Sequence, residues 1–275
     1  MKVLIIGAKG MLGQELVKTF SIDHHVTAWD REEIDITDEQ VVSSKLRAVG
    51  PDIVINAAAF NDVDGAETNS ESAKKINGYA VGYLATSARE LNIPIVHYST
   101  EYVFDGNKKD GYRESDQPNP QSVYAVSKYL GEQELQNHTN EYYLIRLSRL
   151  FGGSGIGKKS FVQTMLDLAR SRSELEVVDE ELSCPTYAVD LARRTKYIVE
   201  HKLPYGIYHC ANSGAVTWYG FAQEIFKISG KNVKLNPVPA SRFPRPAQRP
   251  AYGILLNTKL PAMRSWPEAL REFLK

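Results

Sequence analysis

The chain begins MKVLIIGAKGMLG (residues 1–13), and this stretch decides the fold. Its apolar run, Val3–Ile6, has the short, continuous pattern of a strand that is buried on both faces. Three glycines follow at once, and apolar side chains then recur at helical spacing from Met11 to Phe20. A strand, a glycine-rich turn and a helix in this order are typical of the first unit of a parallel α/β sheet.

The same alternation of short apolar runs and helical patterns continues as far as residue 148. We predict further strands at 25–29, 53–56, 95–99 and 142–147, and further helices at 38–49, 70–91 and 122–137. Strands that alternate with helices are joined by right-handed crossovers. The predicted fold class is therefore α/β, a Rossmann-type doubly wound parallel sheet whose ligands bind beyond the carboxyl ends of the strands.

The glycine loop predicts a dinucleotide site, because its backbone N–H groups and the following helix N-terminus can approach a pyrophosphate closely. Asp30 lies 23 residues after Gly7, where an acid can accept from the 2′-OH of an adenosine ribose. This favours NADH slightly, although the adjacent Arg31 could instead pair with the 2′-phosphate of NADPH. The predicted cofactor-binding residues are Gly7, Gly10, Met11, Leu12, Gly13, Asp30, Arg31, Asp35, Ile36, Ala57, Ala58, Ala59, Tyr124 and Lys128.

The last third of the chain has a different composition. Seven of the 13 prolines lie between Pro237 and Pro267, which predicts a loop-rich lobe with short helices at 218–228 and 267–274. A helix at 189–200 is expected to return to the first domain. We assign residues 1–148 and about 189–203 to a dinucleotide-binding domain, and about 149–188 and 204–275 to a smaller substrate-binding lobe.

Composition excludes several classes of protein. The 275 residues include 33 Lys+Arg and 33 Asp+Glu, so the chain lacks the basic excess of a nucleic-acid-binding protein. No stretch approaches the roughly 18 apolar residues of a membrane span, and the apolar run at 3–6 is too short for a signal peptide. Cys184 and Cys210 are isolated, as in a reducing compartment. We expect a cytoplasmic monomer or homodimer.

Three residues predict the chemistry. Tyr124 and Lys128 are four residues apart on one predicted helix and share a face. A free tyrosine has a pKa near 10, and a nearby ammonium lowers it. Thr100 follows the strand at 95–99, where a substrate carbonyl would lie. Taken singly, the pair could be solvent-facing and Thr100 could cap a strand end, but together with the glycine loop they predict a catalytic site.

The chain resembles an extended short-chain dehydrogenase/reductase over nearly its whole length. More closely, it resembles the dTDP-4-dehydrorhamnose reductases of dTDP-L-rhamnose synthesis. The matching segments are the glycine loop, DITD (35–38), NAAA (56–59), VD-x-AE (63–67), STEYVFDG (99–106), Tyr124 with Lys128, PT (185–186), GIYH (206–209), WY-x-FA (218–222) and RP (249–250).

The resemblance implies reduction of the 4-keto group of a dTDP-4-dehydro-6-deoxy sugar by NADPH or NADH. It implies that Tyr124 protonates the oxygen formed, that Lys128 holds the nicotinamide ribose, and that Thr100 orients the carbonyl. Asn77 would support a proton relay or serve only in helix packing. The expected substrate-binding residues are Thr100, Glu101, Tyr102, Val103, Arg149 and Arg249.

Two departures from the family pattern fall on the expected substrate side. Arg149 stands where an aromatic ring is usual, and Ser160 where asparagine is usual. A guanidinium can stack or bind phosphate but does not replace an apolar wall, so the particular sugar stays open. Glu15 matches one of the glutamates that bind Mg²⁺ in some members, but Val189 breaks that set. We therefore predict no metal site.

Two other functions agree with the same motifs. The regulatory subunit of methionine adenosyltransferase resembles these reductases and binds NADP without working chiefly as an enzyme, and a fold alone does not determine function. A sugar-nucleotide epimerase or dehydratase would recycle its cofactor and would consume no NAD(P)H overall.

Overall fold

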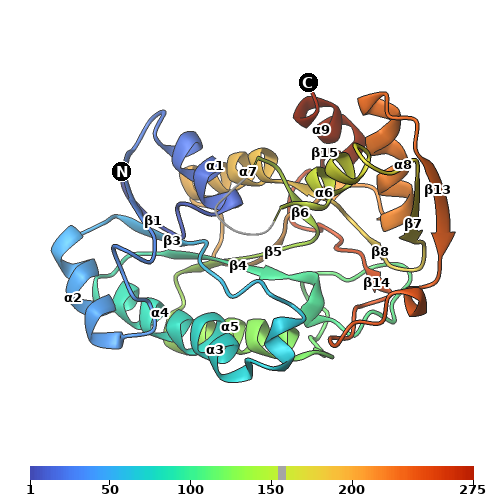
Figure 1. Cartoon of the computed structure of the whole chain (residues 1–275). Coiled ribbons are helices and arrows are strands. Elements are labelled where there is room, and N and C mark those ends of the chain that lie inside the picture. The colour runs from blue at the N-terminus through green and yellow to red at the C-terminus, as the bar shows by residue number, and fades with distance from the viewer. Residues whose placement is uncertain (154–158) are drawn as a thin grey trace.

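A six-stranded parallel sheet forms the centre of the molecule (Figure 1). The computed structural model describes residues 1–153 and 159–275. The strands are β1 (Lys2–Ile6), β2 (His25–Trp29), β3 (Ile53–Asn56), β4 (Ile95–Thr100), β5 (Tyr142–Leu147) and β10 (Gly206–His209). They occur in the order β10-β5-β4-β3-β1-β2, and every neighbouring pair is parallel. The α/β prediction is confirmed, and the five predicted strands agree with β1 to β5 within one residue.

Helices cover both faces of this sheet (Figure 1). They are α1 (Met11–Phe20), α2 (Glu39–Val49), α3 (Ser70–Lys74), α4 (Ala80–Glu90), α5 (Val123–His138) and α7 (Ala188–Glu200). Val3 and Ile5 of β1 share a core cluster with residues of α1 and α7, whereas Leu4 and Ile6 pack with α2 and α4. Successive side chains of a strand point to opposite faces, so the unbroken apolar run of β1 reflects burial on both sides.

The long helix predicted at 70–91 is divided in the structure. Between α3 and α4 lies a π-helical turn, η2 (Lys75–Tyr79). Asn77 lies in this turn, and its Nδ2 donates to Phe60 O and to Ser127 Oγ, both at 3.0 Å. These tertiary hydrogen bonds tie the turn to the loop after β3 and to α5.

The smaller lobe contains α6 (Phe161–Leu168), α8 (Trp218–Ser229) and α9 (Trp266–Phe273), together with short strand pairs. The strands are β6 (Leu150–Phe151) with β9 (Thr186–Tyr187), β7 (Glu174–Val178) with β13 (Lys234–Val238), β8 (Leu182–Ser183) with β12 (Val216–Thr217) and β14 (Tyr252–Gly253), and β11 (Asn212–Ser213) with β15 (Met263–Ser265). Its core includes aromatic residues of α8 and β6. The helices predicted at 218–228 and 267–274 agree with α8 and α9 within one residue.

One part of the predicted domain division differs from the structure. Residues 206–209 form β10, which pairs with β5 in the large sheet rather than joining the smaller lobe. The short GIYH segment is half-buried to buried, and the edge of the sheet beside β5 offers it a full parallel partner. The rest of the division remains a prediction.

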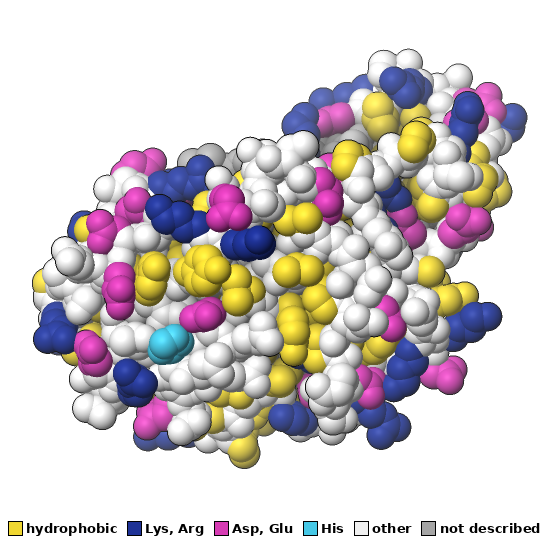
Figure 2. Space-filling model, turned by 90° about the horizontal axis from the view of Figure 1, so that it is seen from below, with side chains coloured by type: hydrophobic (Ala, Val, Ile, Leu, Met, Phe, Trp, Pro, Cys, Tyr) yellow, Lys and Arg dark blue, Asp and Glu magenta, His cyan; other side chains and the backbone are white. Residues whose placement is uncertain are grey.

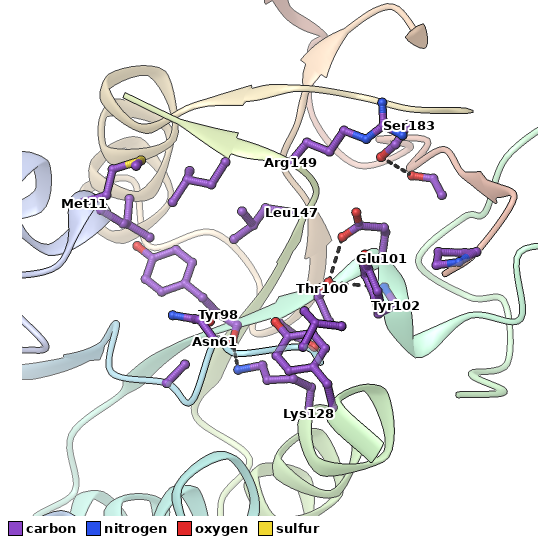
Figure 3. A pocket seen from close by; sticks show the side chains of 18 of the residues that line it. Met11, Asn61, Tyr98, Thr100, Glu101, Tyr102, Lys128, Leu147, Arg149 and Ser183 are labelled. Carbon is purple, nitrogen blue, oxygen red and sulfur yellow. Dashed lines mark hydrogen bonds between the residues drawn. The ribbon is translucent and has the colours of Figure 1, made fainter. Parts of the chain in front are cut away.

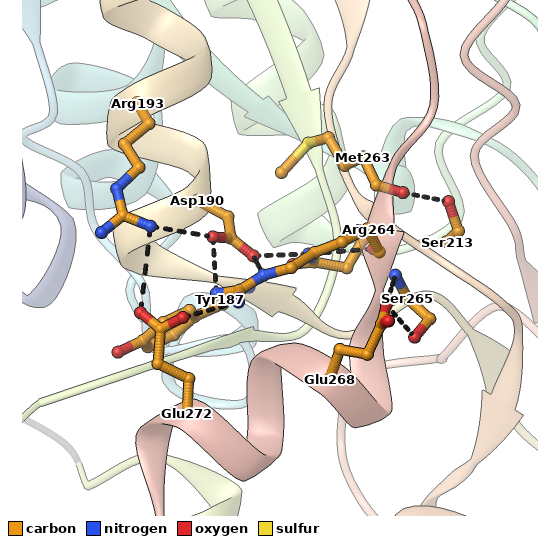
Figure 4. A network of polar contacts seen from close by, with 10 residues as sticks. Tyr187, Asp190, Arg193, Ser213, Met263, Arg264, Ser265, Glu268 and Glu272 are labelled. Carbon is orange, nitrogen blue, oxygen red and sulfur yellow. Dashed lines mark hydrogen bonds and ion pairs between the residues drawn. The ribbon is translucent and has the colours of Figure 1, made fainter.

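A polar network joins the two parts of the molecule (Figure 4). Asp190 of α7 accepts from Arg264 Nε at 2.7 Å and from Arg264 Nη2 at 2.8 Å. Arg264 also donates to Glu272 of α9 at 2.6 Å, and Asn212 Nδ2 donates to Asp190 at 2.8 Å. Because Asp190 is largely buried and bonded bidentately, this network holds α9 in one position against α7.

Basic and acidic side chains are interspersed on the face seen in Figure 2, in keeping with the zero net charge. No helix among the described residues is long and apolar enough to span a membrane.

Candidate active site

The glycine loop approaches the neighbouring backbone so closely that side chains cannot be accommodated. Gly7 has φ of +80°, and a Cβ there would lie 2.6 Å from Ala58 N. A Cβ on Gly13 would lie 2.0 Å from Gly7 O. Gly10 is the N-cap of α1 and has no side chain to satisfy the amides of the first turn. These N–H groups are therefore available to an anion such as a pyrophosphate.

Asp30 lies beside this loop at the end of β2. Its Oδ2 accepts from Lys9 N at 2.9 Å, and its Oδ1 accepts from Arg31 N at 2.9 Å. The carboxylate therefore stands next to the predicted pyrophosphate site, as a ribose-binding acid requires.

A pocket of about 340 Å³ lies between the carboxyl ends of the central strands and the smaller lobe (Figure 3). Most of the predicted site residues line it, and they come from both parts of the molecule. These are Gly10, Met11, Leu12, Gly13, Ala57, Ala59, Thr100, Glu101, Tyr102, Tyr124, Lys128, Arg149 and Arg249. The volume is in the range of small-molecule sites.

The three predicted catalytic residues meet in this pocket, and all are buried. Ser122 caps the N-terminus of α5 by accepting from Ala125 N, which fixes the helix that carries Tyr124 and Lys128. Lys128 Nζ donates to Tyr98 O at 2.7 Å. The Tyr124 and Tyr102 rings pack edge to face, with centroids 5.6 Å apart.

The pKa values of Tyr124 and Lys128 differ from those expected from the sequence. Burial raises the pKa of Tyr124 above its usual value, and Glu101 adds to this effect. Burial also lowers the pKa of Lys128 to about 8, opposed by Glu132. The predicted lowering of the tyrosine pKa by Lys128 is thus not seen here, because desolvation dominates for both side chains.

Glu101 is a buried carboxyl group directly beside Thr100. Thr100 Oγ1 donates to Glu101 Oε2 at 2.7 Å (Figure 3). Burial raises the pKa of Glu101 to about 7, although the Thr100 hydrogen bond and the nearby Arg149 oppose the shift. Glu101 therefore changes its charge near neutral pH at the place where a carbonyl would bind.

Arg149 forms part of the pocket wall in an unusual conformation. Its φ is +42°, and its guanidinium lies 3.9 Å above the Trp218 ring. Nη1 donates to Val216 O at 2.7 Å, and Nη2 donates to Glu181 O. Burial lowers the pKa of Arg149 to about 10. The side chain is thus a fixed cation, supported from behind by an aromatic ring.

The family model described as "RmlD substrate binding domain" matches residues 1–275. The chain belongs to this family. This chain is also similar to the Spore coat polysaccharide biosynthesis protein SpsK of Bacillus subtilis, which is 37% identical over 279 residues, covering 100% of this chain and 97% of that protein.

Two solved reductase structures are also similar. The dTDP-4-dehydrorhamnose reductase of Clostridium acetobutylicum is 38% identical, with a TM-score of 0.95 over 100% of this chain and 98% of that chain. The dTDP-4-dehydrorhamnose reductase of Bacillus anthracis, in complex with NADP, is 33% identical, with a TM-score of 0.95 over 99% of this chain and 98% of that chain. The resemblance to the dTDP-4-dehydrorhamnose reductase family is therefore confirmed.

Some of the predicted site residues do not line the pocket. Val103 is fully buried in a core cluster with Phe104 and Leu255, away from the pocket wall. Ile36 packs in the core under α2, and Asp35 accepts from Thr37 in the turn before that helix. These three side chains therefore have structural partners in the present arrangement. Gly7 lies in the glycine loop, Ala58 follows β3, and Asp30 and Arg31 follow β2. None of these four residues lines the pocket.

The structure adds pocket residues that were not predicted as site residues, chiefly Tyr98, Glu181 and Trp218. Trp218 belongs to the family-matching WY-x-FA segment, and that match was the only sequence signal for a functional role. Its contact with Arg149 could not be predicted, because it depends on the tertiary fold. Ser160 caps α6 by accepting from Gln163 N. Among the described residues, no group of three or more His, Cys, Asp or Glu is placed to hold a metal ion.

Proposed function

We propose that this chain is an NAD(P)H-dependent reductase of the 4-keto group of a dTDP-4-dehydro-6-deoxy sugar. The simplest reaction converts dTDP-4-dehydrorhamnose to dTDP-L-rhamnose, for nucleotide-sugar and cell-surface polysaccharide synthesis. The observation that carries the proposal is the meeting of Thr100, Tyr124 and Lys128 in one pocket beside the glycine loop. We also propose that it works in the cytoplasm as a monomer or homodimer.

The glycine loop fits a dinucleotide, since a Cβ at Gly7 or Gly13 would clash with backbone atoms. The first-turn amides of α1 bind the pyrophosphate, and Asp30 accepts from a ribose hydroxyl. When bound, NADPH or NADH supplies the hydride. Asp30 favours NADH, whereas the NADP complex of the Bacillus anthracis relative favours NADPH.

The side chains of the pocket bind the substrate and manage its proton. Thr100 orients the carbonyl, Tyr124 donates its phenolic proton to the carbonyl oxygen, and Lys128 binds the nicotinamide ribose. Glu101, Tyr102, Arg149 and Arg249 contact the sugar nucleotide. The raised pKa of Tyr124 keeps the phenol protonated until the substrate oxygen becomes basic.

The proposal is tested with purified protein, enzymatically prepared dTDP-4-dehydrorhamnose, and NADH and NADPH in parallel. Oxidation of reduced nicotinamide in step with formation of dTDP-L-rhamnose is the expected result. Product without net oxidation of the cofactor would indicate an epimerase or a dehydratase. Cofactor binding without turnover, together with co-purification of a methionine adenosyltransferase, would instead indicate a regulatory subunit.

A further inference from the structure

A buried histidine lies directly against the catalytic lysine. His97 is on β4 and is 1% exposed. Its Nε2 lies 3.5 Å from Lys128 Nζ, and its Nδ1 lies 3.2 Å from Asn56 Nδ2. The proposed reaction assigns no role to His97 or Asn56.

The orientation of the Asn56 amide determines which nitrogen of His97 carries a proton. Ala58 N, which can only donate, donates to Asn56 Oδ1 at 3.1 Å. The Asn56 Nδ2 group therefore faces His97 and must donate to Nδ1. Burial and the nearby Lys128 lower the pKa of His97 well below its usual value, so the ring is neutral. A neutral imidazole with an accepting Nδ1 carries its proton on Nε2.

This tautomer directs an N–H donor at Lys128. An ammonium has three donors and no acceptor, so it is repelled by the Nε2–H group. A neutral amine can accept from Nε2–H while it still donates to Tyr98 O. We propose that Asn56 and His97 act as a pair of positioning residues that lowers the proton affinity of Lys128 by holding this N–H against it.

The other ionisable groups around Lys128 do not duplicate this effect. Tyr124 and Glu132 lie on the same helix, one turn before and after it, and Arg146 lies on β5. Glu132 favours the ammonium, but Arg146 donates to both of its oxygens at 2.9 and 2.6 Å. The consequence for turnover rests on the proposed function: a lysine that loses its proton near pH 8 sets the alkaline limit of cofactor binding and proton supply.

The test is an NMR titration that needs neither substrate nor cofactor. Protein labelled with ¹⁵N-histidine and with ¹³C at lysine Cε is measured in the wild type, in His97→Gln and in Asn56→Asp. The Lys128 signal is identified as the lysine signal that is lost in Lys128→Arg. The His97 signal is identified as the histidine signal that is lost in His97→Gln. In the wild type we expect His97 to be the neutral Nε2–H tautomer at neutral pH, because its pKa is lowered, and Lys128 to titrate near pH 8.

The variants have defined expected effects. A carboxylate at position 56 can only accept, so Asn56→Asp should move the His97 proton to Nδ1 and leave Nε2 as an acceptor for the ammonium. In His97→Gln the amide oxygen can take the same accepting role. Both variants should raise the Lys128 midpoint by about one pH unit, the effect of one hydrogen bond to a charged group.

Thr86→Val serves as the control, because it removes a hydrogen bond to a different histidine, His138. It should leave both signals unchanged. An Nδ1–H tautomer in the wild type, ordinary titration of His97, or an unmoved Lys128 midpoint in both variants would overturn the inference. Failure of the reductase assay alone would reject the proposed function and leave this result standing.

Discussion

Replacing Glu101 with glutamine should change both the stability and the pH dependence of this protein. Glu101 is 4% exposed and accepts from Thr100 Oγ1 at 2.7 Å. Burial raises its pKa from 4.5 to about 7. Glutamine has nearly the same shape as the protonated acid but cannot ionise, so the variant isolates the cost of the buried charge.

The magnitude follows from the shift in pKa. Between pH 4.5 and 7 the folded protein holds the Glu101 proton more tightly than the unfolded chain does, so this group's contribution to stability falls as pH rises. The difference of 2.5 units (7 − 4.5) at about 1.36 kcal/mol per unit gives about 3 kcal/mol. Glu101→Gln should therefore be about 3 kcal/mol more stable than the wild type at pH 8 and nearly equal to it at pH 4.

The same ionisation should control the proton of Thr100. When Glu101 is charged, the single hydroxyl proton of Thr100 is donated to the carboxylate. When Glu101 is protonated, its own O–H can donate to Thr100, which leaves the Thr100 proton free for the substrate carbonyl. Wild-type kcat/KM should therefore decline above pH 7. In Glu101→Gln the amide N–H₂ donates to Thr100 at every pH, so the decline near pH 7 should disappear and only the alkaline limit that Lys128 sets near pH 8 should remain.

Urea unfolding at pH 4 and pH 8 measures the first effect, and kcat/KM between pH 5.5 and 9 measures the second. Glu180→Gln is the matched control, since Glu180 is exposed and accepts from Ala240 N at the surface. It should reproduce the wild-type profile. An equal stability difference at both pH values, or an unchanged decline in kcat/KM near pH 7 in Glu101→Gln, would refute the reasoning.

Three further variants test the other parts of the site. Tyr124→Phe should keep its affinity for NADPH but lose about 10²–10⁴-fold in kcat, because only the proton donor is removed; near-normal turnover would reject its role. Arg149→Met loses two hydrogen bonds and the stacking contact with Trp218. It should lower the free energy of unfolding in urea by about 3 kcal/mol and raise the KM for the sugar nucleotide. The exposed control Arg242→Met should change neither quantity. Gly13→Ala should weaken NADPH binding at least tenfold in a fluorescence titration, because the added Cβ would clash with the backbone of the glycine loop. The control Gly153→Ala, where a Cβ would meet open space, should leave the affinity unchanged. Equal affinities of the two variants would contradict the need for glycine at position 13.

The sheet could be predicted from the sequence because its strands are short apolar runs that are separated by helical patterns. The local pattern could not show that the helix at 70–91 is divided, since the π turn is stabilised by Asn77 contacts with Phe60 and Ser127, which are distant in sequence. The local pattern also led us to assign residues 206–209, which form β10, to the smaller lobe rather than to the large sheet. A four-residue strand carries no signal for its partner, and β5 lies about 60 residues earlier.

The pocket was predicted less completely than the sheet, for a related reason. The glycine loop, Thr100 and the Tyr124–Lys128 pair lie in short segments with fixed local geometry, so their chemistry could be inferred from spacing. The raised pKa values of Tyr124 and Glu101 arise from burial, which depends on the folded structure and not on residue spacing. The role of Trp218 likewise depends on its contact with Arg149 across the fold.

The charges of the pocket indicate which group meets the anionic substrate. Arg249 donates to both oxygens of Asp64, and Arg245 pairs with Glu181, so both guanidinium groups already have carboxylate partners. Across residues 1–153 and 159–275, Arg149 and Lys128 bond to main-chain oxygens and form no ion pair. Lys128 lies beside Tyr98 at the predicted ribose site. Arg149 is therefore the cation best placed to attract a phosphate or another acidic group of the substrate, and its exchange for an aromatic residue should alter the choice of sugar nucleotide more than the rate of hydride transfer.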